Sequence, residues 1–144
     1  MTTPVAVLLC FAAWTVLTLF GTIGVYRWSR ILTGRAALSE WRADLPQGSE
    51  TYQRAMRAHM NCVENLPLFG AIVVALVATG LRSSLIDALC IAVLLARISQ
   101  TLIHIAAPST NVWAGLRFSF FLAQIICMVI IGTIIVSSAA TDAA

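Results

Sequence analysis

Four long apolar stretches divide the chain, and most of its polar residues gather between them. The stretches run over Pro4 to Tyr26, Met60 to Leu81, Leu85 to Ile105 and Arg117 to Val136. Each is long enough to cross about 30 Å of hydrocarbon, which takes about 20 residues of α-helix. None alternates as a barrel strand would, and an open sheet cannot satisfy its backbone in lipid. The pattern predicts an all-α membrane protein, a single domain built as a four-helix transmembrane bundle.

Turn signals refine the helix bounds within this domain. Pro46, Gly48 and Ser49 mark a turn, and Ser49 or Thr51 can start a helix. We therefore expect the second helix to begin before it enters the membrane. The expected helices cover about 4–26, 50–81, 85–105 and 112–137, joined first by a hydrophilic connection over about 27–50, in a domain spanning 1–144.

Composition agrees with a membrane protein. Of 144 residues, 60% are hydrophobic and 10% charged, and the mean hydropathy is +0.91. Soluble domains use roughly 45–50% apolar residues. The N-terminus lacks the basic region that precedes the apolar part of a cleavable signal, so the first span is expected to be retained.

The arginines predict how the bundle is oriented. All nine basic residues are arginine, and only Arg82 lies on the side opposite the long connection. The six between the first and second spans are Arg27, Arg30, Arg35, Arg42, Arg54 and Arg57. The positive-inside rule places the 27–50 connection in the cytoplasm and both termini outside. The absence of targeting signals and the compact termini suit a bacterial inner membrane.

Several function classes find no support in the sequence. Nothing resembles a phosphate loop, a zinc signature or a Ser/His/Asp arrangement, so no metal site is expected. The net charge of +3 comes from the hydrophilic connection. It favours contact with anionic membrane lipids over nucleic acid, because the aromatic interleaving typical of nucleic-acid binding is missing.

Polar residues within the later spans share one face of each helix. At about 100° per residue, each set falls within a narrow wedge, and His59 points away from the first of them. The sets are Arg54, Arg57, Asn61, Glu64 and Asn65; then Arg97, Gln100, Thr101 and His104; then Arg117, Phe121, Gln124 and Met128. All three sets fall in the membrane half next to the hydrophilic connection.

The charges on these faces do not balance. An ionisable residue at the centre of a span costs about 2.5–3.5 kcal/mol on insertion scales, so Glu64 needs a cation, either Arg57 or Arg97. One carboxylate cannot also neutralise Arg54 and Arg117. The surplus implies an anionic guest or lipid phosphates. Two simpler interpretations stay open: Glu64 and one arginine pin helices together, or the arginines reach outward to headgroups.

The segment RAMRAHMNCVENLPLF resembles the signature of the MAPEG family, the membrane-associated proteins in eicosanoid and glutathione metabolism. That signature runs R-x-x-R-A-[HQ]-x-N-x-x-E-x-x-P-x-F. The matching positions are Arg54, Arg57, Ala58, His59, Asn61, Glu64, Pro67 and Phe69. RISQTLIH and LRFSFFLA resemble the second and third elements of the family, and the four spans agree over nearly the whole chain.

The resemblance implies a homotrimer that binds glutathione, as co-substrate, between neighbouring subunits near the cytoplasmic side. Members conjugate glutathione to lipophilic electrophiles, reduce or isomerise lipid peroxides, or only bind lipids. Arg117 would stabilise the thiolate, with Arg97 as the alternative, and His104 is a possible general acid. The glutathione-binding residues implied are Arg54, Arg57, Asn61, Glu64, Arg97 and Gln100.

Departures from the family pattern narrow the activity. His104 stands where several eicosanoid enzymes have tyrosine, Gln100 replaces a histidine or tyrosine, and Met60 replaces a basic residue. These changes favour a generic, bacterial-type glutathione transferase or peroxidase. The alternative is a non-catalytic scaffold or lipid-binding protein of the same fold. A small multidrug exporter is disfavoured because Pro4 to Tyr26 contains no acidic residue.

Overall fold

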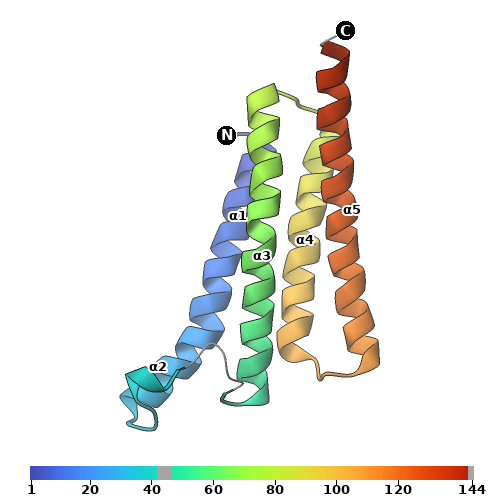
Figure 1. The fold of residues 1–144 in the computed structure, drawn as a ribbon. Helices are drawn as coiled ribbons and strands as arrows, with labels where there is room; N and C mark the ends of the chain where they lie inside the picture. The colour runs from blue at the N-terminus through green and yellow to red at the C-terminus, as the bar shows by residue number, and fades with distance from the viewer. Residues whose placement is uncertain (42–46, 143–144) are drawn as a thin grey trace.

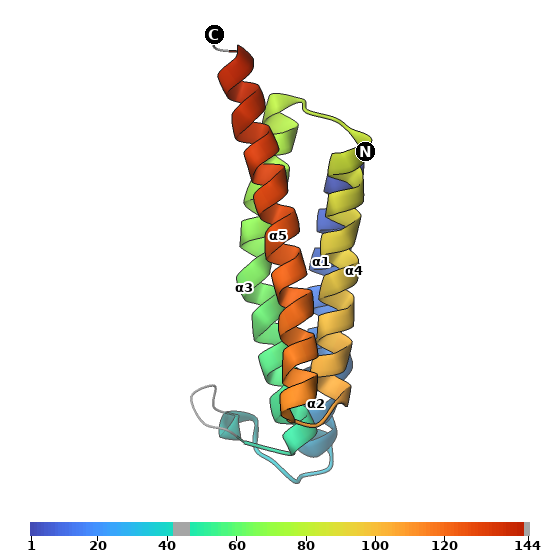
Figure 2. The same cartoon turned by 90° about the vertical axis from the view of Figure 1, so that its right-hand side faces the viewer.

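The described residues form four long helices, which stand side by side along one axis (Figures 1 and 2). The computed structural model describes residues 1–41 and 47–142, so Arg42 and Pro46 lie outside the described residues. The helices are α1 (Thr3–Thr18), which continues through the π-helical η1 (Leu19–Gly24) into α2 (Val25–Leu32), then α3 (Glu50–Thr79), α4 (Ser84–Ala106) and α5 (Asn111–Asp142). Four helices are long and apolar enough to span a membrane, which confirms the predicted all-α membrane class.

The bundle has two distinct ends. The start of α1, the end of α5 and the α3–α4 connection lie at one, which we call the terminal end (Figure 1). The helix α2, the start of α3 and the α4–α5 connection lie at the other, which we call the arginine-rich end. A short 3-10 turn, η2 (Leu38–Glu40), also lies there.

The first helix is longer than the sequence pattern indicated. It was expected to end near Tyr26, where arginines begin, but it continues to Leu32. Polar residues alone do not stop a helix. Gly34 does so here, because it takes φ 66, a left-handed conformation that costs other residues energy. The Gly34 amide donates to the Ile31 carbonyl and the Arg35 amide to the Arg30 carbonyl, 3.0 and 2.8 Å away.

Serine side chains start two of the spanning helices. The Ser49 hydroxyl accepts the Tyr52 amide at 3.2 Å, and the Ser83 hydroxyl accepts the Ile86 amide at 3.1 Å. Each cap satisfies one backbone donor that the first helical turn leaves unpaired. Ser49 is therefore the N-cap of α3, the earlier of the two starting positions considered from the sequence.

The interior is apolar toward the terminal end. Phe11 of α1 and Phe69 of α3 are fully buried with ring centroids 6.1 Å apart, and Val93 and Ile131 join the same cluster from α4 and α5. Large apolar side chains such as Leu17, at 62% exposure, lie on the outside of the bundle. Such an outer surface suits lipid rather than water.

Aromatic residues tie the hydrophilic connection to the arginine-rich end. The rings of Tyr26 and Tyr52 stack with centroids 4.5 Å apart, and Trp41 packs against both. Arg27 lies over the Trp41 ring and its Nε donates to the Tyr52 hydroxyl at 2.7 Å. We call Tyr26, Arg27, Trp41 and Tyr52 the aromatic latch. It fixes α2 and residue 41 against the start of α3.

Candidate functional site

Arg97 lies at the centre of a polar cluster inside the arginine-rich half of the bundle. It is 1% exposed, and its Nη1 donates to Asn61 Oδ1 of α3 and to Gln100 Oε1 at 3.0 Å. Gln124 of α5, which is fully buried, donates to the same Gln100 oxygen at 3.0 Å. These four residues, the polar cluster, join three helices through side-chain hydrogen bonds.

The polar cluster is not saturated. Among the described residues, Arg97 Nε and Nη2 have no hydrogen-bond partner, and neither does Gln124 Oε1. The guanidinium carbon lies 5.4 Å from the centre of the Phe11 ring, an attraction that stabilises a cation. No described carboxylate forms an ion pair with it. A buried guanidinium without an anion is costly, so the cluster favours a negatively charged or carbonyl-bearing partner.

Cys62 borders the cluster as a hydrogen-bonded thiol. Thr101 donates its hydroxyl proton to the Arg97 carbonyl at 2.8 Å. A threonine hydroxyl has one proton, so the contact of 3.4 Å between Thr101 Oγ1 and Cys62 Sγ is donated by the thiol. Cys62 is fully buried and therefore acts here as a small core residue.

Three further arginines lie toward the arginine-rich end. Arg54, Arg57 and Arg117 all lie within electrostatic range of His104, which is half-buried at the end of α4. Arg117 is also half-buried, whereas Arg57 is exposed. Together with Arg97, they bring positive charge from α3, α4 and α5 into one half of the bundle.

A depression of about 390 Å³ opens among these charges. Glu50, Gln53, Arg54, Arg57 and Ser109 line it. Arg54 crosses from α3 to α4, because its Nε donates to the Ile105 carbonyl at 3.2 Å, and its Nη1 lies 3.7 Å from Glu50 Oε2. The depression is open to its surroundings and can admit a charged guest.

The predicted polar face of α3 is divided between inside and outside. Asn61 and Asn65 turn inward, with Asn65 at 4% exposure, whereas Arg57 and Glu64 are exposed. The wedge of roughly 100° spans the boundary of the bundle, so its two edges meet different surroundings. The expected pairing of Glu64 with Arg97 or Arg57 is not formed. Within the described residues, Asn61 takes the place of that carboxylate.

Sequence reasoning overlooked two neighbours of Arg97. Gln124 was noted on the polar face of α5 but not as part of the site, although an amide buried in an apolar span is itself a signal. Phe11 gave no signal, because an aromatic residue in an apolar stretch is indistinguishable from core. Of the described residues, no group of three or more His, Cys, Asp or Glu could hold a metal ion.

Comparison with known protein families matches residues 5–137 of the chain to the MAPEG family. The chain belongs to the MAPEG family. This confirms the resemblance seen in the signature segment and, with the four spanning helices, establishes an integral membrane protein. The MAPEG family includes glutathione transferases and peroxidases as well as members without enzymatic activity. A search of curated protein sequences gives no match to the chain.

Proposed function

We propose that this MAPEG protein is a glutathione-dependent transferase or peroxidase that acts on lipophilic electrophiles or hydroperoxides. One observation carries the proposal: the arginine-rich half holds more positive charge than its carboxylates balance. Among described residues, the one ion pair of its arginines is the loose Arg54–Glu50 contact of 3.7 Å, and Arg97 is buried without a carboxylate. Glutathione, with two carboxylates and an ionisable thiol, supplies negative charge at several points.

The exposed positions of Arg57 and Glu64 support a site shared between copies of the chain. Both lie on the outer surface of one bundle, where lipid would otherwise meet two charged groups. In a homotrimer they would face a neighbouring subunit and hold the charged ends of the tripeptide with Arg54. Asn61, Arg97 and Gln100 would form the inner wall of the same site.

Arg117 is the better candidate for the thiolate partner. Arg97 is 1% exposed and its Nη1 is already held by Asn61 and Gln100. Arg117 is half-buried and has no side-chain hydrogen bond among the described residues. A thiol of pKa near 8.5 is only a few per cent ionised at pH 7. A neighbouring guanidinium favours the thiolate and stays charged when partly desolvated.

The thiolate would attack a second substrate that enters from the bilayer. In the transferase reaction a carbon–sulfur bond forms and the leaving group departs with its electron pair. In the peroxidase reaction the sulfur attacks the terminal peroxide oxygen and the O–O bond breaks, so that an alcohol leaves after protonation and the sulfur becomes a sulfenic acid. A second glutathione then attacks that sulfur, forms the disulfide and releases water. His104, among the three arginines, is the candidate proton donor to the departing oxygen or leaving group.

The arginine distribution supports a cytoplasmic position for this site. Arg27 and Arg30 lie on α2 and Arg35 follows it in the connection, at the same end of the bundle as the start of α3, whereas Arg82 lies in the α3–α4 connection at the terminal end. By the positive-inside rule the connection between α2 and α3 would lie in the cytoplasm and both termini outside.

The test combines binding and turnover on protein purified in detergent. Calorimetric titration should give about one glutathione per chain, and the protein should conjugate an aryl halide or reduce an organic hydroperoxide. Arg117→Ala should still bind glutathione but lose at least about tenfold in rate, the factor that 1.36 kcal/mol of transition-state stabilisation represents. Arg35→Ala, which removes an exposed arginine of the connection, should match the unmodified protein. Absence of glutathione binding would overturn the proposal.

A non-catalytic member of the same fold is the second candidate. The hydrogen bond from Gln124 to Gln100 joins α5 to α4, and the bond from Arg97 to Asn61 joins α4 to α3. That network stabilises the bundle whether or not chemistry follows, which favours a structural use of the buried arginine. Glutathione binding without turnover of either substrate would support this candidate.

A further inference from the structure

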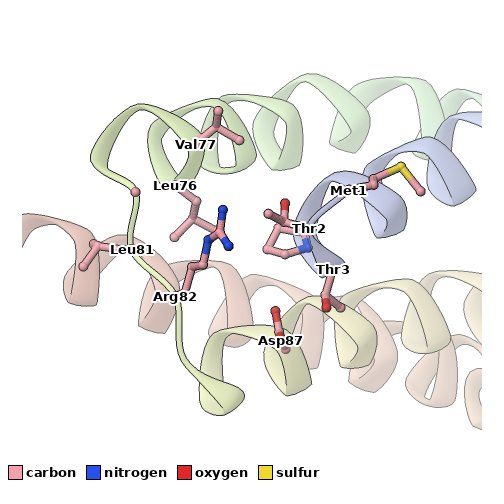
Figure 3. Close-up of a pocket in the computed structure, with 10 residues that line it drawn as sticks. Met1, Thr2, Thr3, Leu76, Val77, Leu81, Arg82 and Asp87 are labelled. Carbon is pink, nitrogen blue, oxygen red and sulfur yellow. The ribbon is translucent and has the colours of Figure 1, made fainter.

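A second pocket lies at the terminal end (Figure 3), which is the opposite end of the bundle from the arginine-rich site (Figure 1). Its volume is about 270 Å³. Thr2 and Thr3 line it from the start of α1, Leu76 and Val77 from the end of α3, and Arg82 and Asp87 from the connection and first turn of α4. The lining therefore combines polar and apolar side chains.

Arg82 and Asp87 carry opposite charges and both line this pocket, but they do not form an ion pair with each other. Figure 3 shows the Arg82 guanidinium and the Asp87 carboxylate both directed into the space between α1, α3 and α4. Among the described residues, neither side chain has an ion pair within 4.0 Å or a hydrogen bond. A separated cation and anion match a ligand that carries both charges, with its anion toward Arg82 and its cation toward Asp87.

The size and place of the pocket identify the kind of ligand. Drug-sized ligands occupy about 300–1,000 Å³, so this pocket has room for a small headgroup and not for a whole amphiphile. It lies where the spanning helices end, at the boundary between hydrocarbon and headgroups. Val77, at 59% exposure, leads from the pocket to the lipid-facing side of α3.

We propose that this pocket binds the headgroup of a zwitterionic phospholipid, phosphatidylethanolamine. The phosphate lies against Arg82, the primary ammonium lies against Asp87, and the threonine hydroxyls complete the polar side. The acyl chains run outside the pocket along the apolar surface of the bundle. A primary ammonium can donate hydrogen bonds to a carboxylate, so the pocket distinguishes this headgroup from an anionic one that lacks the amine.

The test is native mass spectrometry of delipidated protein titrated with defined lipids. Phosphatidylethanolamine should bind at one site per chain about tenfold more tightly than phosphatidylglycerol, the size expected for one charge-assisted hydrogen bond. Asp87→Asn should abolish that preference, and Arg82→Gln should weaken both lipids. Arg35→Gln, an exposed arginine at the other end, should change neither. Equal binding of both lipids to the unmodified chain, or no effect of Arg82→Gln, would overturn the proposal.

A variant that fills the pocket distinguishes lipid bound in the pocket from lipid bound nonspecifically to the apolar surface of the bundle. Val77→Trp should fill the pocket and remove the site while leaving glutathione binding unchanged. Val136→Trp places the same ring on an exposed position of α5, 69% exposed and outside the pocket, and should keep the site. Soluble glycerophosphoethanolamine should displace the lipid only at far higher concentration. Displacement at equal concentration would mean that the acyl chains contribute nothing to binding. The ligand of this pocket would then be a soluble headgroup compound and not a phospholipid.

Discussion

Arg97 places a guanidinium where the described part of its own bundle offers amide groups and no carboxylate. Asn61 and Gln100 each accept a hydrogen bond from Nη1, and Phe11 presents its ring, but these groups carry no net charge. Arginine tolerates such a site because its charge is delocalised and weakly hydrated. Lysine holds the same charge on one nitrogen and cannot reproduce the planar fork.

Arg97→Lys should therefore destabilise the protein by about 1–3 kcal/mol, because Asn61 and Gln100 are left with poorly met acceptors in a buried place. Unfolding in detergent, followed by circular dichroism, measures the change. Arg35→Lys makes the same substitution at an exposed position and should leave the unfolding midpoint unchanged. If Arg97→Lys and Arg35→Lys have the same unfolding midpoint, the polar cluster does not stabilise the bundle.

Among the elements, the aromatic latch sets how closely the chain before α3 can approach. Gly48 takes φ 76, and a Cβ built there would lie 2.8 Å from Tyr52 Cδ1 and 3.1 Å from Tyr26 Cε1. Real Cβ atoms essentially never come as close as the first distance, the second is tighter than most Cβ contacts, and both rings are held by stacking. Glycine is therefore required at this position for two reasons, its backbone conformation and its lack of a side chain.

A pair of variants measures the backbone conformation and the lack of space for a side chain separately. Gly34 also takes a positive φ, 66, but a Cβ there would meet nothing within 4 Å. Gly34→Ala should cost about 1–2 kcal/mol, the left-handed penalty alone, and Gly48→Ala should cost more because the Tyr52 ring must also move. Thermal unfolding midpoints of the two variants give the comparison. If the two variants lose equal stability, the rings of the aromatic latch can move aside for the new Cβ at no cost in free energy.

The spacing of residues along each helix predicts which side chains share a face, but not where that face points. Arg97 and Gln100 were expected together on α4 and are hydrogen-bonded there. On α3 the same arithmetic grouped Asn61 with Glu64, and the bundle buries one and exposes the other, because helix rotation is set by contacts between elements. The continuation of the first helix beyond Tyr26 was missed for a similar reason, because it depends on contacts between elements. Arg27 lies over the Trp41 ring of the connection and donates to the Tyr52 hydroxyl of α3.

At the scale of the whole molecule, one bundle leaves a carboxylate where lipid is expected. Glu64 lies halfway along α3 and is exposed. In a lone bundle it would face hydrocarbon at a cost of about 2.5–3.5 kcal/mol on insertion scales, and residues of this kind in spans normally face protein or a watery cavity. In the shared site that we propose, a neighbouring copy and the ammonium group of a bound glutathione would cover this face and remove the conflict.

Glu64→Leu decides between these situations because the two predict opposite results. If Glu64 meets lipid, the substitution removes a costly charge, so the unfolding midpoint should rise and glutathione binding should not change. In the shared site that we propose, native mass spectrometry should show three chains per particle, and Glu64→Leu should weaken glutathione binding by about tenfold or more, the effect of losing one charged hydrogen bond. Met60→Leu, on the exposed side of α3 one turn earlier and 48% exposed, is the control that keeps an apolar side chain and should leave binding unchanged. A single chain per particle together with unaltered binding in Glu64→Leu would refute the shared site. The Glu64 charge would then contribute nothing to glutathione binding, and no second subunit would cover it.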